Sequence, residues 1–384
     1  MGRILIINKV VAPGMRILVD LRLLSKGGTS GIEEYARNLL NNLFALDKRN
    51  EYNLFYNGFQ KVSLTSNLQL PASNCKIIDW RIPNKILDFS SRFLRWPAID
   101  KFIPTDAIFS PHFNILKTKK APRVITFHDL SFLHHPYFFS PKQKFWHWLQ
   151  DYRAQAMAAE RVIAVSEFTK SDLVNLLKIP PEKIAVIYSG VSDSFRKMPV
   201  QDDRLNFPYI LYLGTLEPRK NVLAIIRAFN ILKSDLKFFD FKLVLAGKPG
   251  WLYRTILREV QNSPYKDDII LWGSISDHDR VSLYNLARVF VYPSFFEGFG
   301  FPPLEAQACG CPVVVADRTS LPEVVGDSAL RVNPWKIDEL SEAIKQAVFN
   351  DDLKREMITK GLENVKRFNW RDTAAKVLSC LENL

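Results

Sequence analysis

Tyr292-Pro-Ser-Phe-Phe-Glu297-Gly-Phe-Gly-Phe-Pro-Pro-Leu-Glu305 combines a strand end, a glycine-rich loop and a helix start. The apolar run at about residues 289–292 predicts a buried strand, and the paired prolines suit the first turn of a helix. A buried strand that runs through a glycine loop into a helix is the repeating unit of a doubly wound parallel sheet. We therefore expect this half of the chain to form a Rossmann-like α/β domain.

Two carboxylates flank the glycines of this segment. Glu297 lies within the loop, whereas Glu305 lies about one turn inside the following helix. Gly298 and Gly300 allow a ligand to approach the backbone closely, and the amides at a helix start favour an anion. We expect a diphosphate at this helix start and hydroxyl groups on the carboxylates. The structural alternative is a carboxylate that caps the helix beside two turn glycines.

A second segment of the same kind is Tyr209-Ile-Leu-Tyr-Leu-Gly-Thr-Leu-Glu-Pro-Arg-Lys-Asn221. Gly214 permits a tight turn against a ligand, and Arg219 and Lys220 supply two adjacent cations. This pair suits a leaving diphosphate, whose negative charge grows as a glycosidic bond breaks. The alternative is a solvated basic helix start. Cations at a helix N-terminus oppose the helix dipole, however, and so favour an anionic ligand.

The alternation of strands and helices continues through the whole chain, whose 384 residues are too many for one ordinary hydrophobic core. A polar segment with prolines at about residues 189–208 interrupts the pattern and predicts an interdomain linker. We predict an α/β fold of two doubly wound parallel-sheet domains and a final helix. The predicted ranges are 1–195, 196–366 and 367–384.

His128 follows the apolar segment Arg123–Phe127, which predicts a buried strand. Ligands of open parallel sheets bind beyond the carboxyl ends of the strands, so His128 lies where chemistry is expected. A histidine titrates near neutrality, so it is suited to donate to a hydroxyl or to stabilise developing charge. Asp129 is placed to orient the loop or the acceptor. The alternative is a buried histidine bonded to the backbone.

Positive charge is concentrated in the first half of the chain. Residues 1–200 carry 28 Lys and Arg against 16 Asp and Glu, whereas residues 201–384 carry 24 of each. Residues 81–123 alone carry nine basic against three acidic side chains. Within them, residues 85–96 mix basic with apolar side chains and predict a short amphipathic helix that suits an anionic membrane surface. The alternative is that its aromatic residues belong to the core.

Several classes of protein are disfavoured by the sequence. No apolar run reaches the length of a membrane-spanning helix, and the start is no signal peptide, so we predict a cytoplasmic protein, peripheral on the inner face of the membrane. Four cysteines give neither a disulfide framework nor a zinc site. The triplet Asp277-His278-Asp279 is interpreted as a capped helix start, and no metal is predicted.

These segments together resemble glycosyltransferase family 4, also called group 1 glycosyltransferases. The resemblance covers about residues 15–375 and is carried by four segments: the Glu297–Glu305 motif, the loop from Gly214 to Lys220, Val165-Ser-Glu-Phe-Thr-Lys-Ser-Asp172 and Thr126-Phe-His-Asp129. It implies a GT-B fold of two facing Rossmann-like domains. It also implies a nucleotide-sugar donor held mainly by the second domain, transfer with retention of configuration, and no metal or other cofactor.

The resemblance also implies roles for single residues. Glu305 would bind the donor ribose, Glu297 the sugar hydroxyls, and Arg219 with Lys220 the diphosphate. His128 would contact the donor sugar, so we predict His128, Arg219, Lys220 and Glu297 as catalytic residues. Gly31 would lie beside the diphosphate from the first domain, and the final helix would cross back onto that domain. The donor site would further include Gly214, Gly298, Phe299 and Gly300.

The detailed loops look most like bacterial mannosyltransferases of polysaccharide assembly. GDP-mannose is therefore the expected donor, with UDP-sugars as the alternative, and the expected acceptor is a glycan or a lipid-linked acceptor. A nucleotide-sugar epimerase of the same fold remains a rival. A glycogen-synthase-like enzyme usually has a Lys-Thr-Gly-Gly opening, whereas this chain has Lys26-Gly-Gly-Thr. No nucleic-acid partner is expected, because the second half is neutral and lacks a recognition-helix motif.

Overall fold

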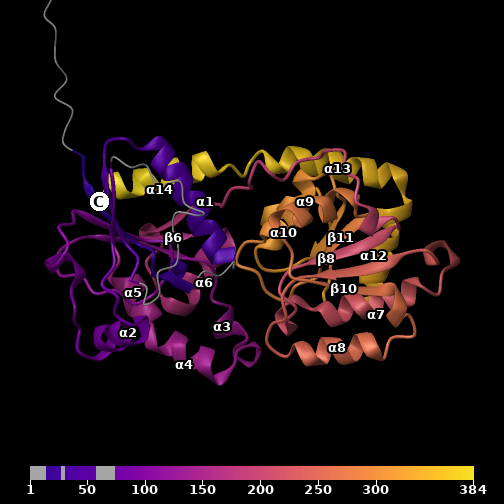
Figure 1. Ribbon diagram of the computed structural model, residues 1–384, viewed down its shortest axis with the longest axis horizontal. Helices are drawn as coiled ribbons and strands as arrows, with labels where there is room; N and C mark the ends of the chain where they lie inside the picture. Colours follow the sequence, from indigo (N-terminus) through magenta and orange to yellow (C-terminus); the bar gives the residue numbers. More distant parts are fainter. Residues whose placement is uncertain (1–13, 27–30, 58–73) are drawn as a thin grey trace, which may run out of the picture. The chain divides into compact units, whose positions relative to one another are not determined.

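The structure is a computed structural model that describes residues 14–26, 31–57 and 74–384 (Figure 1). Its contacts divide the chain into two compact units. The first unit extends to Ile125 and also includes Gln150–Arg161 and Val377–Leu384. The second unit is made of Thr126–Leu149 and Val162–Lys376. Except for Gly31, the predicted site residues all belong to the second unit.

The first sheet has seven strands in the order β3-β2-β1-β4-β5-β6-β7. Strand β1 pairs in parallel with both β2 and β4, so the strand order changes direction beside β1. Strands β4 and β5 consist entirely of buried residues, as expected for a parallel sheet covered by helices. The strand bounds are β1 Arg16–Asp20, β2 Glu51–Phe55, β3 Cys75–Ile78, β4 Ala107–Ser110, β5 Arg123–Phe127, β6 Arg161–Ala164 and β7 Ile184–Val186.

The helices between these strands follow the spacing of their apolar residues. In α1 (Gly31–Leu46), Tyr35, Leu39 and Leu43 recur at helical spacing and are buried. Residues 141–158 form two helices, α4 (Pro141–Leu149) and α5 (Tyr152–Ala158). Asp151 separates them with a left-handed φ of 50°, which helices do not accommodate. The others are α2 (Asn84–Phe93), α3 (Ser131–His134) and α6 (Glu167–Leu177).

The second sheet has six strands in the order β10-β9-β8-β11-β12-β13. Strands β8, β11 and β12 are buried along their whole length, which explains their nearly continuous apolar sequences. The order again changes direction beside β8, which pairs with both β9 and β11. The strand bounds are β8 Tyr209–Leu213, β9 Lys242–Ala246, β10 Ile269–Gly273, β11 Val289–Tyr292, β12 Val313–Ala316 and β13 Leu330–Val332.

Helices cover both faces of this second sheet. Figure 1 shows α7 and α8 on one side of it and α9 and α10 on the other. The helix bounds are α7 Val222–Leu232, α8 Tyr253–Gln261, α9 Asp277–Leu286, α10 Phe301–Ala308, α11 Leu321–Val325, α12 Ile337–Phe349 and α13 Asp351–Val365. Two parallel sheets of this kind confirm the predicted α/β class.

The last helix, α14 (Trp370–Glu382), leaves the second unit and ends in the first. Its residues from Val377 onward cluster with the first unit, where Glu382 forms an ion pair with Arg49. The predicted return of the final helix to the first domain is therefore confirmed.

Candidate functional site

The candidate site begins where the central strand β8 ends. Gly214 follows this strand, and a Cβ on Gly247, after β9, would lie 1.9 Å from the carbonyl oxygen of Gly214. The two loops therefore touch backbone to backbone, which only glycine at position 247 allows. Arg219 and Lys220 lie in a short 3₁₀ helix just before α7. Lys220 is buried there, not solvated.

Glu217, Arg219, Lys220 and Glu297, here called the charged cluster, meet between the loops that follow β8 and β11. The Lys220 Nζ atom donates to Oε1 of Glu297 and to the hydroxyl of Tyr292, each at 2.6 Å. Arg219 lies with Nη1 3.5 Å from Oε2 of Glu297 and with Nη2 2.8 Å from Oε1 of Glu217. Arg219, Lys220 and Glu297, which were predicted to bind the donor's diphosphate and sugar, therefore lie together. Glu305, predicted to bind the ribose, is not part of the charged cluster.

Burial and attraction act in opposite directions on these groups. Burial raises the pKa of the Glu297 carboxyl, but Lys220 and Arg219 outweigh it and leave that pKa below its usual value. Burial and the nearby Arg219 lower the pKa of Lys220, and Glu297 offsets this only in part. Burial also opposes the charge of Arg219, yet Glu297 and Glu217 raise its pKa overall. Strongly perturbed, mutually paired groups of this kind are frequent at functional sites.

The segment after β5 lies against the glycine loop. A Cβ on Gly298 would lie 1.8 Å from the carbonyl oxygen of His128 and 2.8 Å from Cβ of Asp129. The Asp129 carboxylate accepts from the Ser131 amide at 2.9 Å and from its hydroxyl at 2.6 Å. Burial raises the pKa of Asp129, but the positive charge of Arg219 and the bonds from Ser131 lower it overall. The loop of Glu297 thus lies beside His128 and Asp129.

Hydroxyl groups hold the backbone of the glycine loop. Ser166, the N-cap of α6, donates to the carbonyl oxygen of Gly298 at 2.7 Å. Ser320 donates to the carbonyl oxygens of Glu297 at 3.0 Å and Phe299 at 2.7 Å. Ser166 belongs to the segment that carries the family resemblance. Sequence reasoning missed Ser320, although its position shortly after the buried strand β12 was a signal for it.

The hydrogen-bond partners of Glu305 differ from those of Glu297. Its buried carboxylate on α10 accepts from Arg280 through Oε1 and from the Tyr284 hydroxyl, 2.9 Å away, through Oε2. Both partners lie on α9, and the Arg280 guanidinium lies 5.0 Å from the centre of the Phe195 ring. The structure therefore places Glu305 in a second polar group, which the spacing of the two glutamates did not predict.

The start of α10 carries no side-chain cap. Gly300 occupies the N-cap position with φ of 118°, and prolines follow it in the first turn. The Glu297 carboxylate binds Lys220 and not an amide of this helix. The capping alternative therefore does not describe Glu297. Of residues 301–303, which form the first turn of α10, Phe301 carries an amide N–H, because Pro302 and Pro303 have none.

Two further expectations concern other parts of the chain. Gly31 begins α1 in the first unit, and residues 27–30 of its loop lie outside the described residues. Ser276 and Asp279 form a capping box at the start of α9, as expected for a capped helix start. Within the described ranges, no group of three or more His, Cys, Asp or Glu side chains is arranged to hold a metal ion.

Comparison with known proteins places both halves of the chain in glycosyltransferase families. Residues 193–364 match the model described as "Glycosyl transferases group 1", and residues 29–195 match that of "Glycosyltransferase Family 4". The O-antigen chain mannosyltransferase B of Escherichia coli is 33% identical over 269 residues, which cover 68% of this chain and 70% of that protein.

Solved structures share the fold at low sequence identity. Sucrose-phosphate synthase from Thermosynechococcus elongatus superposes with a TM-score of 0.77 at 20% identity, covering 96% of this chain and 98% of that one. HepE from Anabaena, solved in complex with UDP and glucose, gives a TM-score of 0.74 at 18% identity, with 96% and 100% covered. These likenesses support the two-sheet architecture.

Proposed function

Because the chain belongs to glycosyltransferase family 4, whose members are retaining nucleotide-sugar hexosyltransferases, we propose that it transfers mannose from GDP-mannose to a glycan or lipid-linked acceptor. The observation that carries the proposal is the charged cluster, in which Lys220 and Arg219 meet Glu297 beside an uncapped helix start. Mannose is supported by the O-antigen chain mannosyltransferase B. A UDP-sugar is the second candidate donor, supported by the HepE complex with UDP and glucose.

In the proposed reaction the donor's diphosphate binds at the start of α10. The Phe301 amide, the positive end of the α10 dipole and the two cations neutralise the phosphates, and they stabilise the charge that grows on the diphosphate as the glycosidic bond breaks. Lys220 has three N–H donors and two hydrogen-bond partners, Tyr292 and Glu297, so it can add a phosphate oxygen to its shell. Glu297 then turns part of its carboxylate toward the sugar hydroxyls.

Glu305 is proposed to bind the ribose hydroxyls. A carboxylate has about four acceptor sites, and Arg280 and Tyr284 occupy two of those on Glu305. Ribose hydroxyls can therefore bind beside these two partners. The contact with Arg280 is a charge-assisted hydrogen bond, which fixes the orientation of this buried carboxylate.

Retention is proposed to proceed on one face of the sugar. A departing phosphate oxygen takes the proton of the acceptor hydroxyl while that hydroxyl attacks the anomeric carbon from the same side. The His128 side chain is proposed to contact the donor sugar, since its backbone lies against Gly298. Gly31 is proposed to approach the diphosphate from the first unit.

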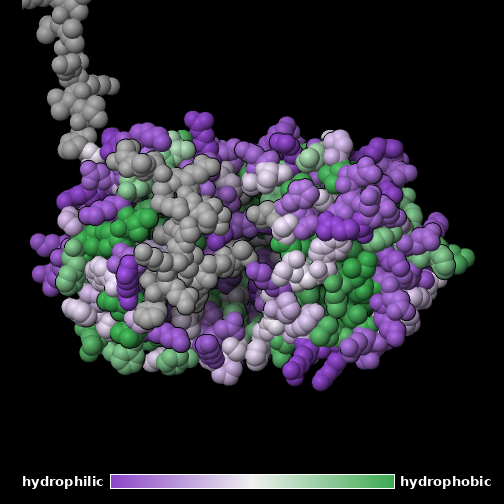
Figure 2. Space-filling model, viewed as in Figure 1, coloured by the Kyte–Doolittle hydropathy of each residue, from purple (hydrophilic) through white to green (hydrophobic). Residues whose placement is uncertain are grey.

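The acceptor is proposed to reside at an anionic membrane surface that α2 contacts. The outer side of this helix exposes Ile86, Phe89 and Phe93 to 59%, 56% and 50%, whereas Leu87 and Asp88 are buried. These exposed fractions show that the three are not core residues. Figure 2 shows hydrophobic residues on the surface in this part of the first unit. Basic residues occur among them and just beyond them, at Lys85, Arg92 and Arg95.

This membrane contact is proposed as peripheral. Among the residues that the structure describes, no helix has both the length and the apolar character to cross a membrane. An exposed aromatic face flanked by basic side chains is the arrangement expected of a helix that lies in the membrane interface. A cytoplasmic location follows from this proposal and stays a prediction.

A donor screen tests the proposed reaction. Thermal unfolding is measured with GDP, UDP and ADP, and GDP at about 100 times its Kd should stabilise the protein by about 2.7 kcal/mol. Radioactive GDP-mannose incubated with membrane extracts should then yield labelled lipid-linked glycan. An isomerised free nucleotide sugar, with no labelled acceptor, would favour the epimerase instead.

Vesicle flotation tests the membrane contact separately. The protein should float with anionic vesicles at low salt, stay behind with neutral ones, and be released as the salt concentration rises. Phe89→Ser combined with Phe93→Ser should abolish flotation. Phe145→Ser, in α4 of the second unit, removes an equally exposed phenylalanine and should leave flotation unchanged. Equal binding to neutral vesicles would contradict the proposal.

A further inference from the structure

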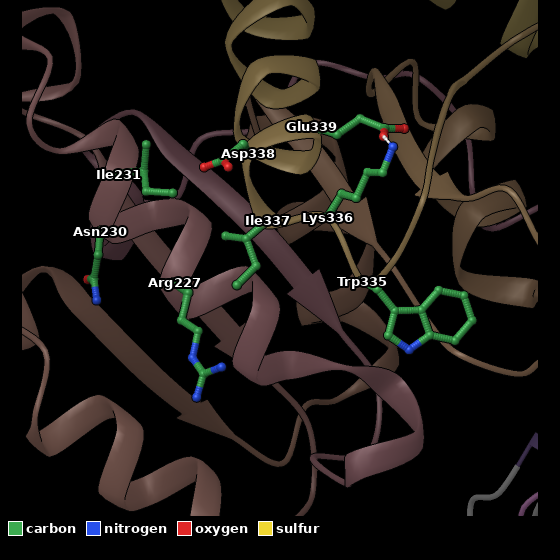
Figure 3. A pocket seen from close by; sticks show the side chains of 8 residues that line it. All are labelled: Arg227, Asn230, Ile231, Trp335, Lys336, Ile337, Asp338 and Glu339. Carbon is green, nitrogen blue, oxygen red and sulfur yellow. Dashed lines mark ion pairs between the residues drawn. The ribbon is translucent and has the colours of Figure 1, made fainter.

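Two adjoining pockets lie beside the loop after β13, in the second unit. The larger, of about 670 Å³, lies between α7 and the start of α12, and the smaller, of about 410 Å³, extends toward Asp317 and Arg331. Both are lined by Trp335, Lys336 and Glu339. In Figure 3 the ring of Trp335 points away from the start of α12, while Lys336 points the other way toward Glu339. No residue of the charged cluster lines either pocket.

Trp335 is held in place although most of its ring faces solvent. Its side chain is 59% exposed. The Arg318 guanidinium lies 4.2 Å from the ring centre, and the Phe295 ring lies 5.5 Å away. The loop backbone is fixed as well, because Asn221 donates to the carbonyl oxygen of Pro334 at 2.7 Å. The tryptophan therefore offers an oriented aromatic surface.

The rim of the two pockets is polar and nearly neutral. It contains four basic and three acidic side chains together with two asparagines. Planar amide, carboxylate and guanidinium groups offer donors and acceptors to hydroxyl groups. The mixed charges suit a hydroxyl-rich neutral ligand better than a polyanion. The charged residues and asparagines are Arg227, Arg318, Arg331, Lys336, Asp317, Asp338, Glu339, Asn230 and Asn333.

We infer that this surface binds a carbohydrate chain, with a sugar ring stacked on Trp335. The apolar face of a pyranose ring packs on an aromatic ring, while its edge hydroxyls reach the polar rim. The inference rests on the proposed function in one respect: the chain that binds here is the acceptor glycan, several sugars away from the end that reacts.

The position of the surface supports this assignment. Phe295, which packs on Trp335, lies two residues before Glu297, and its amide donates to the carbonyl oxygen of Arg219 at 2.9 Å. The Phe138 ring stacks on Phe295 with ring centres 6.2 Å apart, and it also packs against Tyr137, which is 63% exposed. The aromatic surface thus adjoins the loop of the charged cluster without being part of it.

Direct binding of oligosaccharides tests the inference without any transfer reaction. The full-length protein is titrated calorimetrically with an α-linked mannopentaose, and with maltopentaose and a galactopentaose as further probes. The protein should bind at least one of them, and Trp335→Ala should weaken that binding about fivefold or more, as expected from loss of an aromatic stack. Trp335→Phe should restore most of it.

Two controls separate this site from folding and from the donor site. Trp148→Ala removes a tryptophan that is 51% exposed on α4 and should leave oligosaccharide binding unchanged. Stabilisation by GDP should be the same in Trp335→Ala as in the unaltered protein. Transfer to a long acceptor should fall in Trp335→Ala through a higher KM, whereas transfer to a single mannoside should not change.

The outcomes distinguish the inference from the proposed function. Failure of all three probes to bind, or equal binding by Trp335→Ala, would overturn the inference while leaving donor use intact. If the protein binds an oligosaccharide through Trp335 but transfers no mannose, the carbohydrate-binding surface is confirmed and the proposed function is wrong. If Trp335→Ala lowered transfer to long and short acceptors equally, Trp335 would not bind the part of the acceptor glycan that lies several sugars from its reacting end.

Discussion

The two units each bury a group of opposite charges, and the groups differ in how completely they satisfy one another. In the first unit, Arg22 donates to both carboxylate oxygens of Asp20, to Asp88 and to the carbonyl oxygen of Ile115. In the second unit, Lys220 has two partners for its three donors, beside the uncapped start of α10. The saturated group joins β1 to α2, whereas the unsaturated one retains capacity for an anion.

Arg22→Ala disrupts the first group, and we expect it to have the largest effect on the stability of the protein. It leaves Asp20 and Asp88 buried without their cation, which should cost about 3–5 kcal/mol of unfolding free energy in urea titrations. Arg49→Ala is the matched control in the same unit, because its ion pair with Glu382 is exposed. That control should cost less than about 1 kcal/mol. Similar losses of unfolding free energy from both variants would show that the buried charges around Arg22 stabilise the protein no more than an exposed ion pair.

Lys220→Ala disrupts the second group, and we expect it to lower enzyme activity more than the stability of the protein. Turnover should fall by about 10²–10³-fold, as for other groups that stabilise charge in the transition state. Lys233→Ala is the control, since Lys233 is also a buried lysine of the second unit with an acidic partner, Asp268. It should lower the melting temperature yet keep turnover. Nearly unchanged turnover in Lys220→Ala would refute its role.

The first group should also dominate the response to acid between about pH 6.5 and 4. Burial lowers the pKa of His112, which lies beside Asp20, to about 4. The unfolded chain therefore binds a proton at a higher pH than the folded one, and stability falls as pH decreases through this window. The loss amounts to at most about 3 kcal/mol. His112→Gln should flatten this part of the stability profile measured in urea, and an unchanged profile would contradict the assignment.

Ser320→Ala should produce the smallest effect of these variants. It tests whether the Ser320 hydroxyl holds the backbone of the glycine loop. It removes the one hydroxyl proton that the carbonyl oxygens of Glu297 and Phe299 share, a contribution of about 0.5–1.5 kcal/mol. We expect KM for the nucleotide sugar to rise while the melting temperature changes little, with recovery in Ser320→Thr. An equal change in Ser234→Ala, an exposed serine at the end of α7, would indicate a general effect.

Local sequence was sufficient for the parts of the site that follow from strand ends. The apolar runs before Gly214 and Glu297 are long and bounded by glycine, so both strands were predictable. Because neighbouring parallel strands end at the same edge of a sheet, the meeting of Arg219, Lys220 and Glu297 followed from their positions.

Other features depended on tertiary contacts that no local pattern encodes. Arg280 and Tyr284 bind Glu305 because α9 packs beside α10, and helical spacing alone does not show which helices become neighbours. The break between α4 and α5 at Asp151 is not encoded locally either. Aspartate tolerates the left-handed conformation without requiring it, and here its carboxylate pairs with Arg92 from another helix.

Asn221 connects the two regions of the second unit on which the proposals rest. Its side-chain amide nitrogen has two hydrogens, and they bind the carbonyl oxygens of Pro293, at 3.2 Å, and Pro334, at 2.7 Å. One of these prolines precedes the loop of Glu297, and the other precedes Trp335. An oligosaccharide that moved the backbone at Pro334 would therefore alter a hydrogen bond of Asn221, the neighbour of Lys220. Binding of a long glycan would then change the affinity for the nucleotide sugar, and the reverse would also hold.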